Sequence, residues 1–180
     1  RNHTKTLRSA AIILVRCRQN KSACWRQNSY YFCDIISNMW SCEIIDKNVV
    51  LANGLFRGCR RLKTANLSKI QNSECTDDLF RDCIALRQVK INKNWKYIEN
   101  RIFYNCRNLT SVNIPSKVRR VGSKAFGNCR SLKKIKMPKS VKKIEKDAFK
   151  GCKKLTLYVK KGSYAHKYAK KYHVKYKYWK

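Results

Sequence analysis

Apolar positions recur along this chain with a period of about 23 residues. Phenylalanines mark the same place in successive copies: Phe56, Phe80, Phe103, Phe126 and Phe149. A cysteine follows each of them three residues later, and the steps between phenylalanines are 24, 23, 23 and 23 residues. A fixed period in the twenties is typical of solenoids, in which each repeat buries its apolar face only by stacking on its neighbours. The pattern therefore predicts a repeat architecture.

The clearest copy spans residues 126–149 and reads FGNCRSLKKIKMPKSVKKIEKDAF. Its alternation of apolar and polar residues at Ile135, Lys136 and Met137 predicts a short strand with one buried face. Pro138 ends this strand, because proline cannot donate a hydrogen bond to a ladder. In residues 140–149 the apolar positions lie three and four apart, which predicts an extended or single-turn helical arc around the core.

The C-terminal end departs from the repeat and predicts a cap. Residues 155–159 form a last apolar strand, and Gly162-Ser163 then offers a turn and a helix N-cap. Residues 174–178 alternate as a further strand would. Apolar residues recur at helical spacing between these two strands: Tyr164, Ala165, Tyr168, Ala169 and Tyr172.

The N-terminal end shows only a trace of the repeat. If the register is extended backwards, Met39, Cys42 and Ile44 fall where Leu132, Ile135 and Met137 lie. One faded repeat around residues 36–44 is expected, since terminal repeats are commonly atypical. We therefore divide the chain into an N-terminal flank (1–48), a repeat array (49–157) and a C-terminal cap (158–180).

The repeat resembles a known family. The run A-F-x-x-C-x-x-L-x-x-I-x-I/M-P-x-x-V-x-x-I is similar to the BspA-like, or treponemal-type, leucine-rich repeats, and YVKKGSYAHKYAKKY resembles their terminal cap. The resemblance covers about residues 49–180 and is most specific from Ile98 onward, whereas Ser68 and Asn92 stand where later copies have proline. It implies an α/β leucine-rich-repeat solenoid, a right-handed superhelix with short parallel strands on its concave face and a helix–strand cap.

The resemblance also implies a function. Such proteins are mostly bacterial surface or secreted proteins associated with adhesion and with binding of host proteins or other cells. It implies a non-catalytic interaction or adhesion module, located at a cell surface or secreted. The expected partner is a host or cell-surface protein, followed by an anionic glycan, with nucleic acid ranked below both. We expect a monomer.

The predicted binding surface is the strand face opposite the core. Successive copies should stack its outward residues into ladders about 5 Å apart, and repeat arrays use such faces for recognition. Every solenoid needs a polar strand face, so the pattern alone does not show that these residues bind a ligand. The candidate residues are Thr64, Asn66, Gln88, Lys90, Ser111, Asn113, Lys134, Lys136, Thr156 and Tyr158.

The charge of the chain supports a second hypothesis. The formal net charge is +33, and residues 115–180 carry 23 Lys or Arg against only Glu145 and Asp147. This balance describes either a solvated basic face or a scaffold that binds polyanions, nucleic acid or anionic glycan, through salt-sensitive contacts. Tyr164, Tyr168, Tyr172, Tyr176, Tyr178 and Trp179 could stack on bases, but their spacing is explained more simply as cap core. The lysines concerned are Lys133, Lys134, Lys136, Lys139, Lys142, Lys143, Lys146, Lys150, Lys153 and Lys154.

The ten cysteines raise the question of disulfides and metal sites. Stacked cysteines of neighbouring turns would lie close enough to bridge, but parallel inward side chains point poorly for a disulfide, so buried thiols are favoured. Cys75 replaces a buried isoleucine, and Cys17, Cys24, Cys33 and Cys42 stay undecided. No C-x-x-C pair exists, which disfavours zinc. The ladder consists of Cys59, Cys83, Cys106, Cys129 and Cys152.

No arrangement of residues indicates catalysis. His3, His166 and His173 fall in no catalytic motif, and neither paired carboxylates nor a glycine-rich phosphate loop can be identified. We therefore predict no enzyme activity, cofactor or metal.

The chain shows no segment suited to membrane insertion. Its N-terminal apolar run, residues 10–15, is far shorter than the ~20 residues that span a bilayer. Because the chain begins with Arg1 rather than Met, we interpret it as a fragment or a processed product whose targeting signal lies elsewhere.

Overall fold

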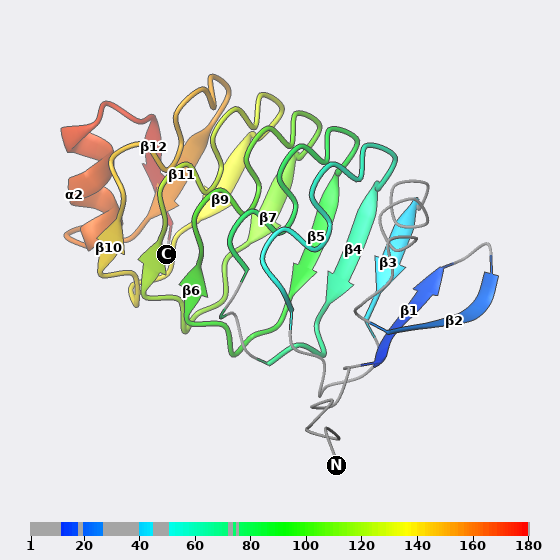
Figure 1. The fold of residues 1–180 in the computed structure, drawn as a ribbon. Helices are drawn as coiled ribbons and strands as arrows, with labels where there is room; N and C mark the ends of the chain where they lie inside the picture. Colours follow the sequence, from blue (N-terminus) through cyan, green and yellow to red (C-terminus); the bar gives the residue numbers. More distant parts are fainter. Residues whose placement is uncertain are drawn as a thin grey trace, which may run out of the picture.

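A computed structural model describes residues 12–17, 20–26, 40–44, 51–71, 74 and 76–179, with backbone alone for 12–17 and 20–26. The chain winds into a parallel β-solenoid, and each turn contributes one short strand to a common face (Figure 1). The strands of this face are β3 (Ser41–Glu43), β4 (Thr64–Leu67), β5 (Gln88–Ile91), β7 (Ser111–Asn113), β9 (Lys134–Lys136) and β11 (Thr156–Val159). The predicted leucine-rich-repeat solenoid is confirmed.

The strand face consists of two hydrogen-bonded sheets, ordered β3-β4-β5 and β7-β9-β11 with β12 (Tyr176–Tyr178) at the end. The repeat register continues across the junction between β5 and β7. There the Thr110 backbone N–H donates to the Arg87 carbonyl at 3.4 Å, and the equivalent bond one turn later joins the Lys133 N–H to the Thr110 carbonyl at 3.1 Å. From β3 to β11, each strand of this face has a buried residue at its inward position, from Cys42 in β3 to Leu157 in β11.

A second row of very short strands follows the first around the core. It consists of β6 (Tyr97–Ile98), β8 (Arg120–Val121) and β10 (Lys143–Ile144), paired in parallel and in register. The segment after β5, β7 and β9 is therefore extended, which decides for these turns between the two conformations that the spacing allowed. Figure 1 shows this row and the looped turns that join it back to the strand face.

The phenylalanines form a continuous stack through the core. Successive rings, from Phe56 to Phe149, have centroids 5.2–5.7 Å apart and are stacked. Beyond Phe149 the ring of Tyr168 closes the stack edge-on at 6.1 Å. The 23-residue step in the sequence thus corresponds to one aromatic layer.

The cysteine ladder has a polar role as well as an apolar one. From Cys83 onward, each thiol donates to the carbonyl of the phenylalanine in the preceding turn, as Cys106 Sγ does to Phe80 O at 3.0 Å and Cys129 Sγ does to Phe103 O at 3.0 Å. Burial raises the pKa of the Cys106 and Cys129 thiols, which keeps these donors protonated. All five ladder cysteines are thiols, so that prediction is confirmed.

Of the other cysteines, Cys42 is also a buried thiol. Cys33 and Cys75 lie outside the described residues, as do the side chains of Cys17 and Cys24.

Both ends of the array carry extra structure. Strand β3 pairs in register with β4, Cys42 opposite Ala65, and Ile44 is buried, so the faded repeat is confirmed where it is described; Met39 lies outside the described residues. Before it stands an antiparallel hairpin that the pattern did not predict, β1 (Ile12–Cys17) and β2 (Asn20–Arg26).

The C-terminal cap is a helix followed by a strand, as predicted. Helix α2 (Tyr164–Lys171) starts after Ser163, whose side chain accepts the His166 N–H at 3.2 Å. Its buried face, Ala165, Tyr168 and Ala169, covers the last turn. Strand β12 then joins the edge of β11. Within the described residues no helix is both long and apolar enough to cross a membrane.

Candidate ligand-binding face

The strand register places the ten predicted site residues in two parallel rows. The first row is Thr64, Gln88, Ser111, Lys134 and Thr156, and the second row is Asn66, Lys90, Asn113, Lys136 and Tyr158. Side chains alternate along a strand, so both rows point away from the core. The sequence therefore predicted correctly which residues share this face, and their role in binding stays a prediction.

The second row changes character along its length. At the N-terminal end Asn66 Nδ2 donates to Glu43 Oε1 at 2.8 Å, so an acidic group and a fixed amide stand side by side. Towards the other end the row carries Lys90 and Lys136, and Lys177 of β12 continues it beside Tyr158. The second row thus carries its lysines from Lys90 onward, in alternation with the neutral residues Asn113 and Tyr158.

A groove lies at the C-terminal ends of β7 and β9, directly beside the second row. We call it the Trp179 groove; it has a volume of about 360 Å³. Ile114, Pro115 and Pro138 line its apolar part, Trp179 walls it, and Lys93 and Lys136 stand at its rim. The groove brings two predicted site residues, Asn113 and Lys136, into one concavity.

The sequence pattern assigned Trp179 to the cap core, which is wrong, because Trp179 lies beside Lys136 at the strand face. The ammonium groups of Lys136 and Lys160 lie 3.6 and 4.1 Å from its ring centroid, which is cation–π contact. Tyr178 of β12 pairs with Val159 of β11. Trp179, the residue after Tyr178, therefore lies level with Lys160 and Pro138, which follow β11 and β9, and not in the cap. The indole Nε1 is buried and has no hydrogen-bond partner in the described part of the chain.

The assignment of the C-terminal aromatics to the cap core was correct for some of them only. Tyr168 is buried there and Tyr176 packs against the core. Tyr164, Tyr172 and Tyr178 are exposed, so the assignment was wrong for these three. They lie where the helix and last strand face solvent.

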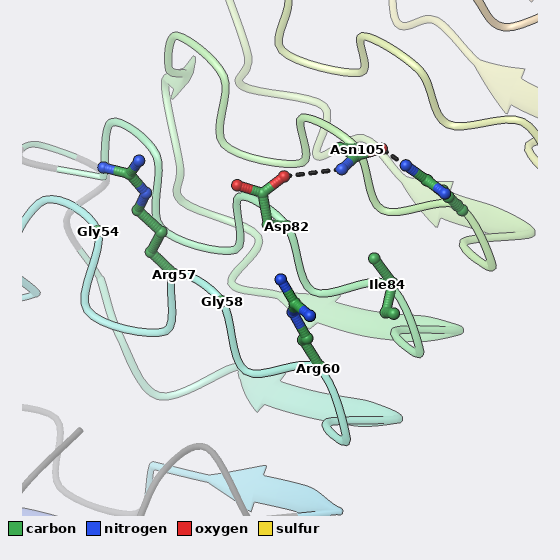
Figure 2. A pocket seen from close by; sticks show the side chains of 8 residues that line it. Gly54, Arg57, Gly58, Arg60, Asp82, Ile84 and Asn105 are labelled. Atoms are coloured by element: carbon green, nitrogen blue, oxygen red, sulfur yellow. Dashed lines mark hydrogen bonds between the residues drawn. The ribbon is translucent and has the colours of Figure 1, made fainter. Parts of the chain in front are cut away.

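A second concavity lies on the turn side of the array, with a volume of about 570 Å³ (Figure 2). The concavity is open at Gly58 because glycine has no side chain to fill it; a Cβ there would meet nothing within 4 Å. In the next two turns, Asp82 and Asn105 stand at the equivalent position. Asn105 donates to Asp82 at 2.7 Å and accepts from Arg107 at 2.9 Å. We call this concavity the arginine hollow, after Arg57, Arg60 and Arg107, which line it.

The ten lysines of the polyanion hypothesis are all exposed, but they do not share one face. Lys134 and Lys136 lie on the strand face, Lys143 lies on β10, and Lys150 and Lys153 lie in the turns. Of the ten, Lys143 makes the one ion pair found within the described residues, with Glu145 at 2.9 Å. The basic charge therefore surrounds the array.

Charge pairs on the turn side act both within a turn, where Arg81 pairs with Asp78 and Asp82, and between turns. The Arg101 guanidinium binds both Asp78 oxygens, at 2.9 and 2.8 Å, and its hydrogen bonds lower the pKa of Asp78. Among the described residues no three His, Cys, Asp or Glu side chains come together as a metal would require.

Comparison with known proteins agrees with this geometry. A family model described as BspA type leucine rich repeat region matches residues 27–156 in six copies. None of the curated proteins compared with the chain matches it.

Several solved structures are similar. A leucine-rich repeat protein from Bacteroides ovatus is 28% identical, with a TM-score of 0.67 over 84% of this chain and 38% of its own. The T. pallidum leucine rich repeat protein has 23% identity and a TM-score of 0.57 over 68% and 65% of the two chains. A leucine rich cell surface protein from Faecalibacterium prausnitzii is 23% identical, with a TM-score of 0.61 over 70% of this chain and 33% of its own.

This chain thus spans between 33% and 65% of the length of these three proteins. The likeness at 23% identity concerns the fold alone. The family match covers well over half of the chain and coincides with the stacked turns. The chain belongs to the BspA-type leucine-rich-repeat family.

Proposed function

We propose that this chain is a non-catalytic adhesion module that binds a host or cell-surface protein through its strand face. One observation carries the proposal: two rows of outward side chains continue in register across the turns, over a fully packed core. A rigid array of this kind offers an extended surface whose positions are fixed before binding. Among the described residues, nothing in the geometry favours catalysis over binding.

The proposed location is a cell surface or the extracellular space. Its support is indirect: one structural relative is described as a leucine rich cell surface protein, and this chain spans 33% of it. A monomeric state is part of the proposal, because the cap covers the end of the core that the last turn would expose.

The test is binding of immobilised extracellular proteins by the purified chain and by Ser111→Arg. Ser111 lies in the middle of the first row, so a long charged side chain there should weaken binding about tenfold by obstructing contact. Asn108→Arg adds the same charge at an exposed position in the turn before the strand and should leave binding unchanged. Equal binding by both variants would move the contact surface off the strand face.

A second candidate function is binding of polyanions, and the arginine hollow favours it. Arg57 and Arg60 line this hollow without an ion pair to any described carboxylate, so both guanidinium groups remain available to a phosphate or sulfate (Figure 2). Binding to heparin, DNA and a protein panel over a salt series separates the two functions. Loss of every interaction at moderate salt would favour plain polyanion attraction over specific protein recognition.

A further inference from the structure

We propose that the Trp179 groove binds an extended acidic peptide segment and holds one apolar side chain of it. The inference rests on the proposed function and narrows it, because it names the chemistry of the partner and the part of the strand face that receives it. Three features carry it: an apolar lining, a basic rim and a buried donor without a partner.

The lining suits an apolar side chain. Ile114 and Pro115 are buried beneath the groove, and Pro138 and Trp179 are half-buried at its sides. The two prolines fix the backbone at the ends of their strands, so the lining is held in place without a ligand. An aliphatic or aromatic side chain that enters would remove both partners' apolar surface from water.

A neutral sugar fits this lining poorly. Its hydroxyl groups would need several polar partners, and apart from the Lys93 and Lys136 ammonium groups at the rim, which only donate, the groove offers the Asn113 amide and the Ser116 hydroxyl between apolar walls. Hydroxyls left without partners on binding cost free energy. The lining therefore favours a peptide over a sugar.

The rim sets the charge of the partner. Lys93 and Lys136 stand at the groove, Lys160 lies against the Trp179 ring, and Lys90 precedes them along the second row. None of these four has an ion pair with a carboxylate among the described residues. Acidic side chains on either side of the apolar anchor would meet these ammonium groups, which fixes both the sign and the register of the segment.

The indole of Trp179 supplies the third feature. A buried side-chain donor without a partner is uncommon, because its lost hydrogen bond with water is not replaced. The indole Nε1 is closed to water in the free chain, so a peptide carbonyl or carboxylate oxygen accepts this N–H once the Trp179 side chain shifts on binding. The same oxygen would lie close to Lys136 and Lys160, whose ammonium groups are 3.6 and 4.1 Å from the ring centroid.

The test selects peptides from a random library displayed on phage, with the purified chain as bait, and measures the enriched sequences as fluorescent peptides by anisotropy. We expect Asp or Glu on both sides of a single apolar residue. Charge reversal in Lys136→Glu and loss of the ring in Trp179→Ala should each weaken binding about tenfold or more. Lys153→Glu makes the same charge change at an exposed turn residue and serves as the matched control.

Trp179→Phe guards against a folding artefact, since it keeps a smaller aromatic wall while it removes the N–H donor. If Trp179→Ala loses its melting transition, Trp179→Phe and Lys136→Glu still decide the question. Trp179→Phe should give a smaller loss of affinity than Lys136→Glu. Unchanged binding by both would overturn the proposal.

The other outcomes are equally decisive. Enriched peptides that are neutral or basic, or no enrichment, would refute an acidic peptide ligand. A heparin oligosaccharide that loses affinity in Lys136→Glu while the peptides do not would assign the groove to a glycan, and self-association abolished by the same variant would assign it to a second copy. If bound proteins respond to Ser111→Arg but not to the groove variants, the proposed function stands and this inference alone fails.

Discussion

The two halves of the array share one core but hold their turns together differently. In the N-terminal half, charged side chains link successive turns: Asp78 binds Arg101, Glu99 binds Arg120, and Asp82 accepts from Asn105. In the C-terminal half, residues 124–179, the one ion pair described joins Lys143 to Glu145, two residues away in the same turn, and so does not link turns. The phenylalanine stack and the hydrogen bonds from the cysteine thiols to phenylalanine carbonyls are present in both halves.

This difference shows that shape and surface vary independently in the array. The core repeats because each turn must match its neighbours, whereas the surface residues meet only water or a partner. The C-terminal half retains a dense positive charge that is not neutralised within the described residues, and like charges oppose folding. The Trp179 groove spans the junction of the two halves, with Lys136, Pro138 and Trp179 on its C-terminal side, so a partner that neutralises charge there would bind at the edge of the more basic half.

The largest effect should come from the shared core. Phe80→Ala and Phe126→Ala each remove a fully buried ring with a stacked ring on both sides, one in each half. We expect each to lower the free energy of unfolding by about 3–5 kcal/mol, measured by urea denaturation. Similar losses in the two halves are expected; a clearly smaller loss for one of them would show that the core is not equivalent throughout.

The ion pair between turns should have a smaller effect, confined to its own half. Asp78→Asn keeps a residue that tolerates the left-handed backbone found there, φ 57°, but weakens the bond to Arg101. Because the pair is partly exposed, we expect a loss of about 1 kcal/mol in urea denaturation. Asp147→Asn is the control: the equivalent residue in the last copy binds Ser123 and pairs with no described cation, so its loss should be smaller.

The same pair gives a prediction about pH. Arg101 lowers the pKa of Asp78 in the folded state below its ordinary value of 3.8, so the pair stabilises the fold above that pH. As the pH falls below 3.8 and through the lower folded-state pKa, Asp78 becomes protonated and the contribution is lost. The stability difference between the wild type and Asp78→Asn should therefore shrink on acidification. A difference that stays constant in acid would mean that the charge of Asp78 is not what links the turns.

The periodic part of this molecule could be predicted from sequence, and the aperiodic part could not. Phe126, Cys129 and Ile135 recur because stacked turns demand equivalent packing, so their spacing was enough to predict the strands and even the faded turn at Cys42. The two rows on the strand face followed from the same register. The hydrogen bond of each thiol to a phenylalanine carbonyl could not be foreseen, because it depends on the path of the turn.

Trp179 shows the limit most clearly. Its place beside Lys136 depends on how helix α2 returns the chain to the edge of β11, which occurs once and leaves no repeat in the sequence. The hairpin of β1 and β2 could not be predicted for a related reason: residues 20–26 lack an alternation of apolar and polar positions.

The smallest expected effect tests whether repulsion in the C-terminal half can be relieved. Lys142 and Arg119 occupy the same position in adjacent turns, where the Lys142 N–H donates to the Arg119 carbonyl at 2.8 Å, so two cations lie side by side on the surface. Lys142→Glu replaces a like-charge pair with an opposite-charge pair, worth about 0.2–1 kcal/mol of added stability. The gain should appear as a higher midpoint of thermal unfolding at low salt and should diminish as salt screens the charges. Lys142→Gln separates the two contributions, because removing the repulsion alone should give part of the gain. If neither variant is stabilised, solvent and counterions already neutralise this surface, and the contrast between the two halves would concern binding rather than stability.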